Sequence, residues 1–386
     1  MDERDTPSVR VLLLHNFLSP LRVPLFEALA ERFDLDVWIL GDIRAVRDWP
    51  AEAPNARVRL RVLPHFSIPL GSRYNVILLN YTIARELAQL KPDAVVCCGW
   101  DTPAAFYAAW YALRTKTPFI LWSGSTAAEQ TTLRAITKPF VRWLVRRASA
   151  WVAYGSRAKA YLVSLGAKAD KTFLAYNTVA LEAMASLGAK TNAASMREQL
   201  KIRTKYVALY CGNLLDLKGV GDLIEAFARV DRGHDVTLLL VGSGKDEAQY
   251  RQRVRALGID DRVVFTGFVG RDEVPRYYAM SDVSILPSRS EVWGLVINEA
   301  LACGVPVIAT DACGGAPDLI QDNVNGFVVP ARNVEALAKA IGQFFAEPAR
   351  HMAMREAARE SIAPFTIARA ADAFVDAMHC ALDARG

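Results

Sequence analysis

The stretch Ser288–Ala300, SRSEVWGLVINEA, is the part of the sequence that best indicates the fold. It follows the apolar run Val283–Leu286, a predicted strand, and continues into a predicted helix, Leu295–Cys303, which Gly304 and Pro306 end. A strand that passes through a loop into a helix is typical of parallel sheets covered by helices on both faces. The helix N-terminus presents free backbone N–H groups and the positive end of a dipole, so we expect this loop to bind phosphate.

The loop and the helix place one carboxylate on each side of the expected phosphate site. Glu291 precedes the helix and Glu299 lies about one turn inside it. Gly294, between them, lets a ligand approach the backbone without a side chain in the way. A carboxylate can accept two hydrogen bonds from a vicinal diol, so the pair could hold a ribose and a hexose at opposite ends of a diphosphate. Taken alone, the two glutamates could also be solvated surface residues.

The rest of the chain repeats the alternation of short apolar runs and helical patterns. Helices are predicted at Val23–Arg32, Gly219–Val230, Glu247–Leu257 and Val274–Met280. The predicted strands are Val9–Leu14, Leu35–Leu40, Ala94–Cys98, Pro118–Trp122 and Ala150–Tyr154 in the first half, and Tyr206–Cys211, Val236–Val241, Arg262–Thr266, Val283–Leu286 and Val305–Ala309 in the second. Two wound α/β domains are therefore expected, joined near Asn177–Val179, with ligands beyond the carboxyl ends of the strands.

Length and composition agree with two such domains in a reducing compartment. The chain has 386 residues, too many for one ordinary core, and its 52% hydrophobic and 23% charged residues exclude a disordered or fibrous protein. No apolar run approaches the roughly 18–20 residues that span a bilayer. The acidic N-terminus is unlike a signal peptide, and the six cysteines include no Cys-x-x-Cys pair. We expect a cytoplasmic protein with reduced thiols.

The second half resembles the retaining glycosyltransferases of family 4. The family's mark is two glutamates separated by seven residues, which Glu291 and Glu299 meet. The text from Ser290 to Ile320 follows the family pattern, with Trp293 where Phe is usual. The segments YCGNLLDLKGVGDLIEAF, LLLVGSG, VVFTGFV and NGFVVP are also similar and in order, whereas the first half matches only loosely. The resemblance implies an α/β protein of the GT-B architecture, with two facing Rossmann-like domains and a cleft between them.

The resemblance also implies a donor site in the second half. Glu299 would hold the ribose diol, Glu291 would hold hydroxyls of the donor sugar, and Lys218 would neutralise the diphosphate leaving group. A fixed cation beside the departing oxygen lowers the barrier to breaking a glycosyl–phosphate bond. The expected donor-binding residues are Gly212, Asn213, Lys218, Gly242, Gly267, Glu291, Gly294, Leu295, Val296 and Glu299, of which Glu291 and Lys218 are the catalytic pair. No cluster has metal-ligand spacing, so neither a metal nor a cofactor beyond the nucleotide-sugar substrate is expected.

The sequence departs from the family pattern at two points. Asn213 stands where an arginine usually partners Lys218, so the lysine and the helix N-terminus must neutralise more of the diphosphate. The acceptor-side histidine of the family is absent from Ser123–Ser125, where it would be sought. Ser19 and Arg22 occupy the expected acceptor loop after the first strand. Arg22 is a candidate for an acceptor phosphate; otherwise it is a surface arginine at a helix start.

Charge is concentrated in the first half. Residues 1–189 contain 23 Lys and Arg against 16 Asp and Glu, and the remainder contains 23 against 25. Within the first half, Arg134–Arg147 alternates basic with apolar and aromatic residues at helical spacing, which suits a helix lying on an anionic membrane surface. The alternative is a helix that packs Phe140, Trp143 and Leu144 into its own core. No nucleic-acid recognition module is apparent, so nucleic acid is not an expected partner.

Together these features predict an acceptor-binding domain at 1–178, a donor-binding domain at 179–362 and a C-terminal helix within 363–386 that packs back on the first domain. The predicted function is metal-independent, retaining transfer of a sugar from a nucleotide-diphosphate sugar to a lipid-linked or cell-surface glycan acceptor. The enzyme is expected in the cytoplasm, in part on the cytoplasmic face of the membrane. Two alternatives stay open: another enzyme on the same fold, an epimerase or a phosphorylase, or a non-catalytic partner subunit.

Overall fold

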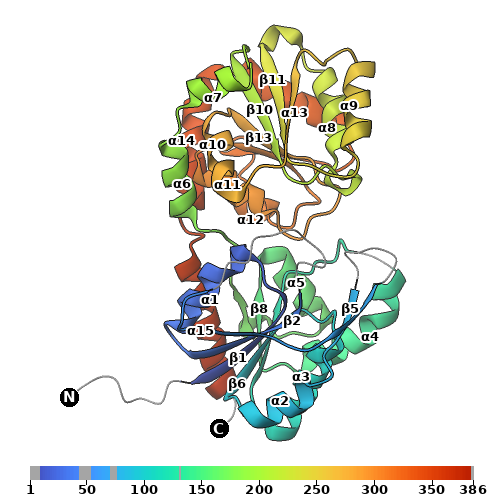
Figure 1. The fold of residues 1–386 in the computed structure, drawn as a ribbon, viewed down its shortest axis with the longest axis vertical. Coiled ribbons are helices and arrows are strands. Elements are labelled where there is room, and N and C mark those ends of the chain that lie inside the picture. The colour runs from blue at the N-terminus through green and yellow to red at the C-terminus, as the bar shows by residue number, and fades with distance from the viewer. Residues whose placement is uncertain (1–8, 43–53, 70–75, 130–131, 384–386) are drawn as a thin grey trace, which may run out of the picture. The chain divides into compact units, whose positions relative to one another are not determined.

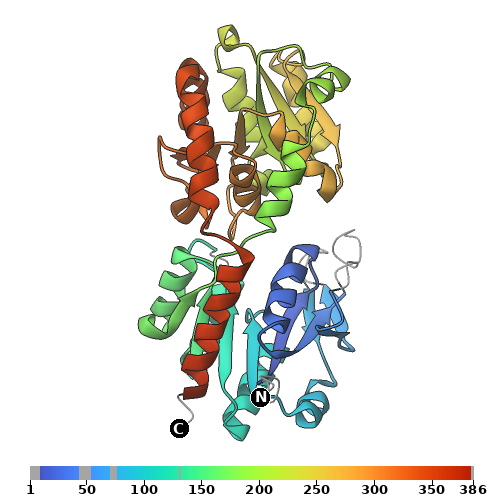
Figure 2. The same cartoon turned by 90° about the vertical axis from the view of Figure 1, so that its left-hand side faces the viewer.

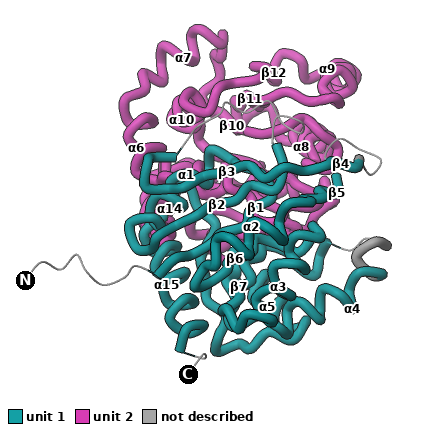
Figure 3. The backbone as a smooth tube through the Cα atoms, turned by 60° about the horizontal axis from the view of Figure 1, so that its bottom comes forward, with its two compact units in different colours: residues 1–179, 367–386 teal, residues 180–366 magenta. Residues whose placement is uncertain are grey.

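A computed structural model describes residues 9–42, 54–69, 76–129 and 132–383 of the chain (Figure 1). The chain divides into two compact units, unit 1 with residues 1–179 and 367–386 and unit 2 with residues 180–366 (Figure 3). The first boundary falls after Val179, one residue beyond the predicted position. The second falls before Ile367 rather than before residue 363, because a turn from Phe365 N–H to the Ile362 carbonyl continues the preceding helix of unit 2.

Unit 1 is built on a seven-stranded parallel sheet with strand order β3-β2-β1-β6-β7-β8-β9. The strands are β1 (Arg10–Phe17), β2 (Asp34–Gly41), β3 (Arg59–Val62), β6 (Ala94–Cys98), β7 (Phe119–Ser123), β8 (Ala150–Ala153) and β9 (Thr172–Leu174). A separate antiparallel hairpin joins β4 (Phe66–Pro69) to β5 (Val76–Leu79). The chain builds the sheet outward in opposite directions from β1 and β6, so these two strands mark a topological switch point.

Helices cover both faces of this sheet because its strands carry apolar residues on both sides. Leu12 and Leu14 of β1 pack under α2 (Ile83–Leu90), α3 (Pro103–Thr115), α4 (Thr132–Arg147) and α5 (Ser156–Leu165). Val11 and Leu13 face the other way, toward α1 (Val23–Ala30) and the C-terminal helix α15 (Ile367–Asp383). This alternation is the period of two expected of a strand. Figure 2 shows α15 beside α1 along unit 1, and the two helices are in contact.

Unit 2 contains a six-stranded parallel sheet with strand order β12-β11-β10-β13-β14-β15. The strands are β10 (Tyr206–Cys211), β11 (Val236–Val241), β12 (Val263–Gly267), β13 (Val283–Leu286), β14 (Val307–Thr310) and β15 (Gly326–Val329). Every residue of β11 is buried, as expected where helices cover both faces of a parallel sheet. β10 and β13 are neighbours from which the chain proceeds in opposite directions, so the switch point of unit 2 lies between them.

Figure 1 shows the helices of unit 2 on both faces of its sheet. One face carries α8 (Val220–Ala228), α9 (Glu247–Ala256) and α13 (Val334–Ala346), whose apolar residues share a core with β10 and β11. The other elements are α6 (Leu181–Ala189), α7 (Ala193–Gln199), α10 (Val274–Ala279), α11 (Leu295–Ala302), α12 (Ala316–Leu319) and α14 (His351–Ile362). Of these, α11 contacts α6, α10, α12 and α14.

The end of α11 shows why one predicted strand begins late. Gly304 adopts a left-handed conformation with φ +68°, and the Val305 N–H donates to the Ala300 carbonyl at 2.9 Å. This cap satisfies the last helical carbonyls and keeps Val305 with the helix. The following strand, predicted at Val305–Ala309, therefore starts at Val307.

Candidate functional site

The loops that carry the predicted donor residues leave adjacent strands at the switch point of unit 2. Lys218 follows β10, in a 3-10 turn over Asp216–Lys218, and Glu291 follows β13. Parallel strands end at the same edge of the sheet, so both loops lie at the carboxyl edge of unit 2. Ligands of open α/β sheets bind at this position. The structure thus brings together residues that are 73 positions apart in the chain.

The N-terminus of α11 is open toward this edge. Gly294 is the residue before the helix, with a left-handed φ of +94°, and no side chain caps the helix there. A Cβ at this position would lie 2.8 Å from the side chain of Leu286 and would be strained by the backbone conformation as well. The Ile297 N–H donates to the Gly294 carbonyl at 2.9 Å, whereas the amides of Leu295 and Val296 have no acceptor within the helix and could bind an anion.

Lys218 and Glu291 form an ion pair across the two loops. The ammonium of Lys218 donates to Oε2 of Glu291, and both side chains are mostly buried, with 26% and 19% of their surface exposed. Glu291 lies in the loop that leads into α11, so the paired ammonium brings a full positive charge to this loop. The site can therefore neutralise a diphosphate, while the paired carboxylate can turn to sugar hydroxyls.

Glu299 lies inside α11 and is held by a tyrosine that the sequence did not indicate. The hydroxyl of Tyr278, from α10, donates to Oε2 of Glu299 at 3.1 Å, and Tyr278 is fully buried. Burial raises the pKa of Glu299 to about 7, although the Tyr278 hydrogen bond and the charge of Arg271 lower it in part. At neutral pH this carboxyl can change its charge when a ligand arrives.

Glycines let the neighbouring loops pack against one another. Gly212 directly follows β10, and Gly242 directly follows β11. A Cβ on Gly242 would lie 2.0 Å from the Gly212 carbonyl oxygen. The Gly242 N–H donates to the Gly267 carbonyl at 2.9 Å, which joins the ends of β11 and β12. All three glycines have positive φ. Asn213, beside Gly212, has an exposed side chain with no hydrogen bond among the described residues.

Trp293, which stands where the family usually has Phe, is buried under the Glu291 loop. Its indole Nε1 donates to Oδ1 of Asn298 at 2.9 Å. The segment after β14 also holds this loop, because the Gly314 N–H donates to the Glu291 carbonyl at 2.9 Å. A Cβ on Gly314 would lie 1.9 Å from the Val292 carbonyl. The carboxylate loop is therefore fixed at both ends.

In unit 1, Arg22 is partly buried and its guanidinium contacts three protein side chains. Its guanidinium carbon lies 4.9 Å from the ring centre of Trp122 and 4.8 Å from that of Tyr154, and Nη1 donates to Oδ1 of Asn177 at 2.6 Å. Ser19 accepts the Arg22 N–H through its carbonyl at 2.8 Å. Burial and the charge of Arg22 lower the pKa of neighbouring His15 to about 3, so this imidazole is neutral. An acceptor contact of Ser19 or Arg22 stays a prediction.

The comparisons with protein families match both units. Residues 25–183 match the model described as Glycosyltransferase Family 4, and residues 192–361 match Glycosyl transferases group 1. The chain belongs to glycosyltransferase family 4. The fold is that of GT-B members: it superposes on Anabaena Alr3699/HepE in complex with UDP with a TM-score of 0.76 and 21% identity, covering 96% of this chain and 100% of that chain.

Two curated relatives are similar over part of their length. The N-acetyl-alpha-D-glucosaminyl L-malate synthase of Bacillus anthracis is 38% identical over 156 residues, 40% of each chain. The GDP-mannose-dependent alpha-(1-6)-phosphatidylinositol monomannoside mannosyltransferase of Mycobacterium tuberculosis is 34% identical over 175 residues, 43% of this chain and 45% of the relative. The matched stretches of this family 4 chain therefore span less than half the length of these two relatives.

The predicted basic helix is α4, and it exposes part of its apolar surface. Leu144 is buried, but 64% of Phe140 and 38% of Trp143 are exposed. The alternative in which all three pack into the core is therefore wrong for Phe140 and largely wrong for Trp143. The reason is that the inward face of α4 is already filled by Val141, Leu144 and Val145. The side chain of Arg134, at the start of the predicted stretch, lies outside the described part.

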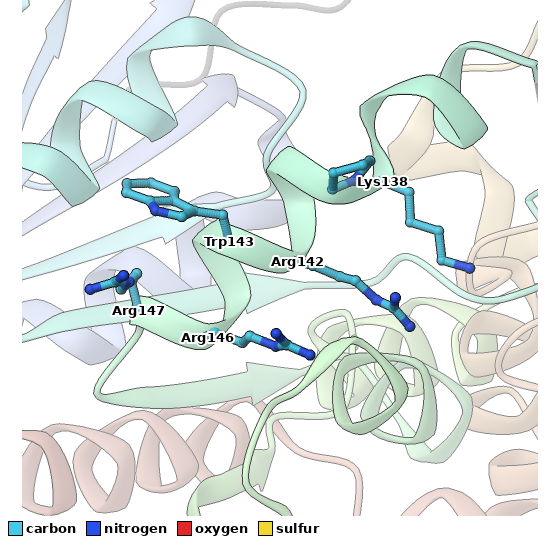
Figure 4. A pocket seen from close by; sticks show the side chains of 6 residues that line it. Lys138, Arg142, Trp143, Arg146 and Arg147 are labelled. Carbon is cyan, nitrogen blue, oxygen red and sulfur yellow. The ribbon is translucent and has the colours of Figure 1, made fainter.

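The basic residues of α4 line a surface pocket (Figure 4). Lys138, Arg142 and Arg146 project to one side of the helix, and Trp143 and Arg147 project to the other. The guanidinium of Arg147 lies 5.8 Å from the Trp143 ring centre. No ion pair of Lys138, Arg142 or Arg146 is found within the described residues. Among the described side chains, four cations and two exposed aromatic rings thus share one helix of this family 4 chain.

No group of three or more His, Cys, Asp and Glu side chains among the described residues could hold a metal ion. None of their helices has the length and hydropathy of a membrane-spanning segment.

Sequence reasoning missed Tyr278, Asn298 and a salt-bridged arginine, Arg289, in the Glu291 loop. Arg289 could have been noticed as a basic residue two positions before Glu291, but its carboxylate partners lie 67 and 73 residues away. Tyr278 carries no local signal, because its role depends on how α10 packs against α11.

Proposed function

We propose that this chain transfers a sugar from a nucleoside-diphosphate sugar to an acceptor hydroxyl. The observation that carries the proposal is the meeting of Lys218, Glu291 and the open N-terminus of α11 at the switch point of unit 2. A nucleoside-diphosphate sugar has the complementary groups: phosphates for the cation and the helix, and hydroxyls for the carboxylates. Two relatives support the proposal: an N-acetyl-alpha-D-glucosaminyl L-malate synthase and a GDP-mannose-dependent mannosyltransferase.

The proposed reaction proceeds with retention and without a metal ion. The bond between the sugar C1 and the β-phosphate oxygen breaks, and its electron pair goes to that oxygen, where Lys218 and the α11 amides stabilise the charge. The acceptor oxygen forms its bond to C1 on the same face. Its proton passes to the departing phosphate. Glu291 orients the sugar through its hydroxyls, and Glu299 holds the ribose.

The test is donor turnover by Lys218→Ala, compared with Lys339→Ala, which removes an exposed lysine on α13. Removal of one transition-state contact typically costs about 2.7–4 kcal/mol, so kcat should fall by about 10²–10³-fold in the first variant only. UDP-glucose and GDP-mannose are offered as donors with a mixture of lipid extracts and free sugars. NMR of the product reports its anomeric configuration, and EDTA should leave the rate unchanged.

Other outcomes would indicate a different function or refute the role of Lys218. Isomerised donor in the absence of an acceptor indicates an epimerase. Sugar phosphate released from a glycan by inorganic phosphate indicates a phosphorylase. Unchanged turnover in Lys218→Ala refutes the catalytic role of the lysine. Nucleotide binding without turnover of any donor favours a non-catalytic subunit.

We further propose a lipid-linked acceptor and association of unit 1 with the anionic cytoplasmic face of a membrane. Support comes from α4, where unpaired cations stand beside exposed Phe140 and Trp143, a combination that suits headgroup phosphates and the acyl boundary beneath them. Each basic residue near such a surface contributes about 1 kcal/mol. One relative is a phosphatidylinositol monomannoside mannosyltransferase, which agrees with a lipid acceptor.

Sedimentation with vesicles tests this association. We expect binding to phosphatidylglycerol-containing vesicles and little binding to phosphatidylcholine alone. The double variant Arg142→Glu, Arg146→Glu should weaken binding by at least tenfold, because two attractions of about 1 kcal/mol each are lost. The matched control Arg255→Glu, Lys339→Glu changes the net charge equally on exposed helices of unit 2. Equal loss in both doubles would mean that only the net charge matters, which refutes a specific role of α4.

A further inference from the structure

Arg289 contacts the Lys218 loop on both sides of the lysine. Its backbone N–H donates to the Leu217 carbonyl at 3.0 Å. Its guanidinium donates from Nε and Nη2 to the two oxygens of Asp222, at 2.9 and 2.7 Å, and from Nη1 to Asp216 Oδ1, at 2.6 Å. Asp216 opens the 3-10 turn that Lys218 closes, and Asp222 lies in the first turn of α8. One side chain of the carboxylate loop therefore holds the lysine loop before and after the lysine.

The contact with Asp222 is the strong part of this arrangement. Only 18% of the Arg289 side chain and 16% of the Asp222 side chain are exposed, and the pair is bidentate. Such planar, charge-assisted pairs restrict geometry more than single hydrogen bonds do. The hydrogen bonds that Arg289 donates to Asp222 raise the pKa of the guanidinium, which stays charged. Asp216 is 76% exposed, so its contact is weaker.

The two loops also touch through their backbones, which leaves little freedom between them. Gly219 follows Lys218 with a left-handed φ of +69°, and a Cβ there would lie 2.0 Å from the Pro287 carbonyl oxygen. Pro287 is two residues before Arg289. The lysine side chain itself has a flexible four-carbon stem, so its ammonium is placed only as well as the turn that carries it.

We propose that Arg289 is a positioning residue that sets the Lys218 ammonium against the diphosphate of the donor. The inference rests on the proposed function, because it assigns a task to the same site. Three of the five guanidinium N–H groups are engaged by aspartates that lie on both sides of Lys218, so Arg289 is placed to act through the lysine. Arg289 does not replace the arginine that the family usually has at the position of Asn213. It fixes Lys218, the cation of the predicted pair that remains.

The test compares nucleoside diphosphates with monophosphates by calorimetry, using UDP, UMP, GDP and GMP. Arg289→Ala should weaken diphosphate binding by about tenfold to a hundredfold, as expected for a charge-assisted contact, and leave monophosphate binding unchanged. In a Lys218→Ala background the same substitution should have no further effect on diphosphate binding, because the two residues act as one unit. Arg289→Lys should restore part of the loss.

Controls separate positioning from general destabilisation. Arg232→Ala removes another arginine that holds an aspartate with two nitrogens, Asp261 at 2.8 and 3.4 Å, before β11 at the opposite edge of the sheet. It should bind all four nucleotides normally. If Arg289→Ala does not fold, Asp222→Asn, which keeps the side-chain shape, is measured instead and should show the same selective loss.

The outcomes decide between the claims. Wild-type protein that binds neither UDP nor GDP overturns the proposed function and this inference with it. Wild-type binding accompanied by equal losses for mono- and diphosphates, or by additive effects of Arg289→Ala and Lys218→Ala, overturns this inference alone.

Discussion

Glu299→Gln is expected to stabilise the empty protein. The pKa of Glu299 rises from 4.5 to about 7 because burial disfavours its charge. The folded state therefore binds the proton more tightly than the unfolded state does. The stabilisation that comes from the proton on Glu299 is complete below pH 4.5 and is lost as pH rises through about 7. A shift of this size corresponds to about 3 kcal/mol. Glutamine keeps an oxygen for the Tyr278 hydroxyl but has no charge, so the variant avoids this loss.

Urea unfolding of the nucleotide-free protein between pH 4.5 and 8.5 measures the effect. The free energies of unfolding of the wild type and of Glu299→Gln should converge near pH 4.5 and differ by about 3 kcal/mol above pH 8. Glu356→Gln, at an exposed position of α14, is the control and should follow the wild type. A difference between wild type and Glu299→Gln that does not change with pH would refute the argument.

The same variant should bind the donor more weakly and without pH dependence. If the ionised carboxylate holds the ribose, about a tenth of the wild-type sites are competent at pH 6, so binding there is about tenfold weaker than at pH 8. UDP-glucose and GDP-mannose are the appropriate probes, because they lack the terminal phosphate whose second pKa lies near 6. Wild-type affinity that is flat over this range would show that the charge of Glu299 is not used.

Three further substitutions test the site. Gly219→Ala should abolish nucleotide binding, because its Cβ would meet a carbonyl of the facing loop at 2.0 Å; Gly258→Ala, with a similar φ but nothing within 4 Å, should cost only about 1–2 kcal/mol of stability. Trp293→Phe removes the hydrogen bond to Asn298 and should cost about 1–3 kcal/mol in urea unfolding, and an unchanged stability would contradict this. Glu291→Gln removes the competing partner of the lysine, so UDP or GDP should bind several-fold more tightly in calorimetry while transfer is lost; weaker binding would show that the pair does not compete with the diphosphate.

The central strands could be predicted from the sequence because each is a mostly apolar run between breakers. Ala94–Cys98, Tyr206–Cys211, Val236–Val241 and Val283–Leu286 have the predicted bounds. The strands that were not predicted are short, and two long helices, α3 and α13, were not predicted either. β3 is mostly exposed and owes its strand conformation to pairing with β2, an interaction that no local pattern reveals.

The residues predicted for the donor site lie in the loops after strands or, for Glu299, in the helix after one, and strand order alone brings these loops to one edge. The side chains that support them could not be predicted, because they meet across loops. Arg22 illustrates the limit: its place after β1 suggested an acceptor phosphate or a surface position, whereas Trp122, Tyr154 and Asn177 enclose it. Asn177 is 155 residues away in the chain, and its hydrogen bond has no sequence signature.

Charge balance explains why the supports matter in a site that lacks the usual second cation. In the empty protein, Lys218 is neutralised by Glu291, and the nearby Arg289 is neutralised by aspartates. A diphosphate therefore meets one lysine that it must share with a carboxylate, together with the partial charge of a helix N-terminus. Glu291 can release the lysine only if sugar hydroxyls replace the ammonium as its partners. A complete donor supplies both the phosphates and those hydroxyls, so this arrangement favours the intact nucleotide sugar over the nucleotide product that must leave.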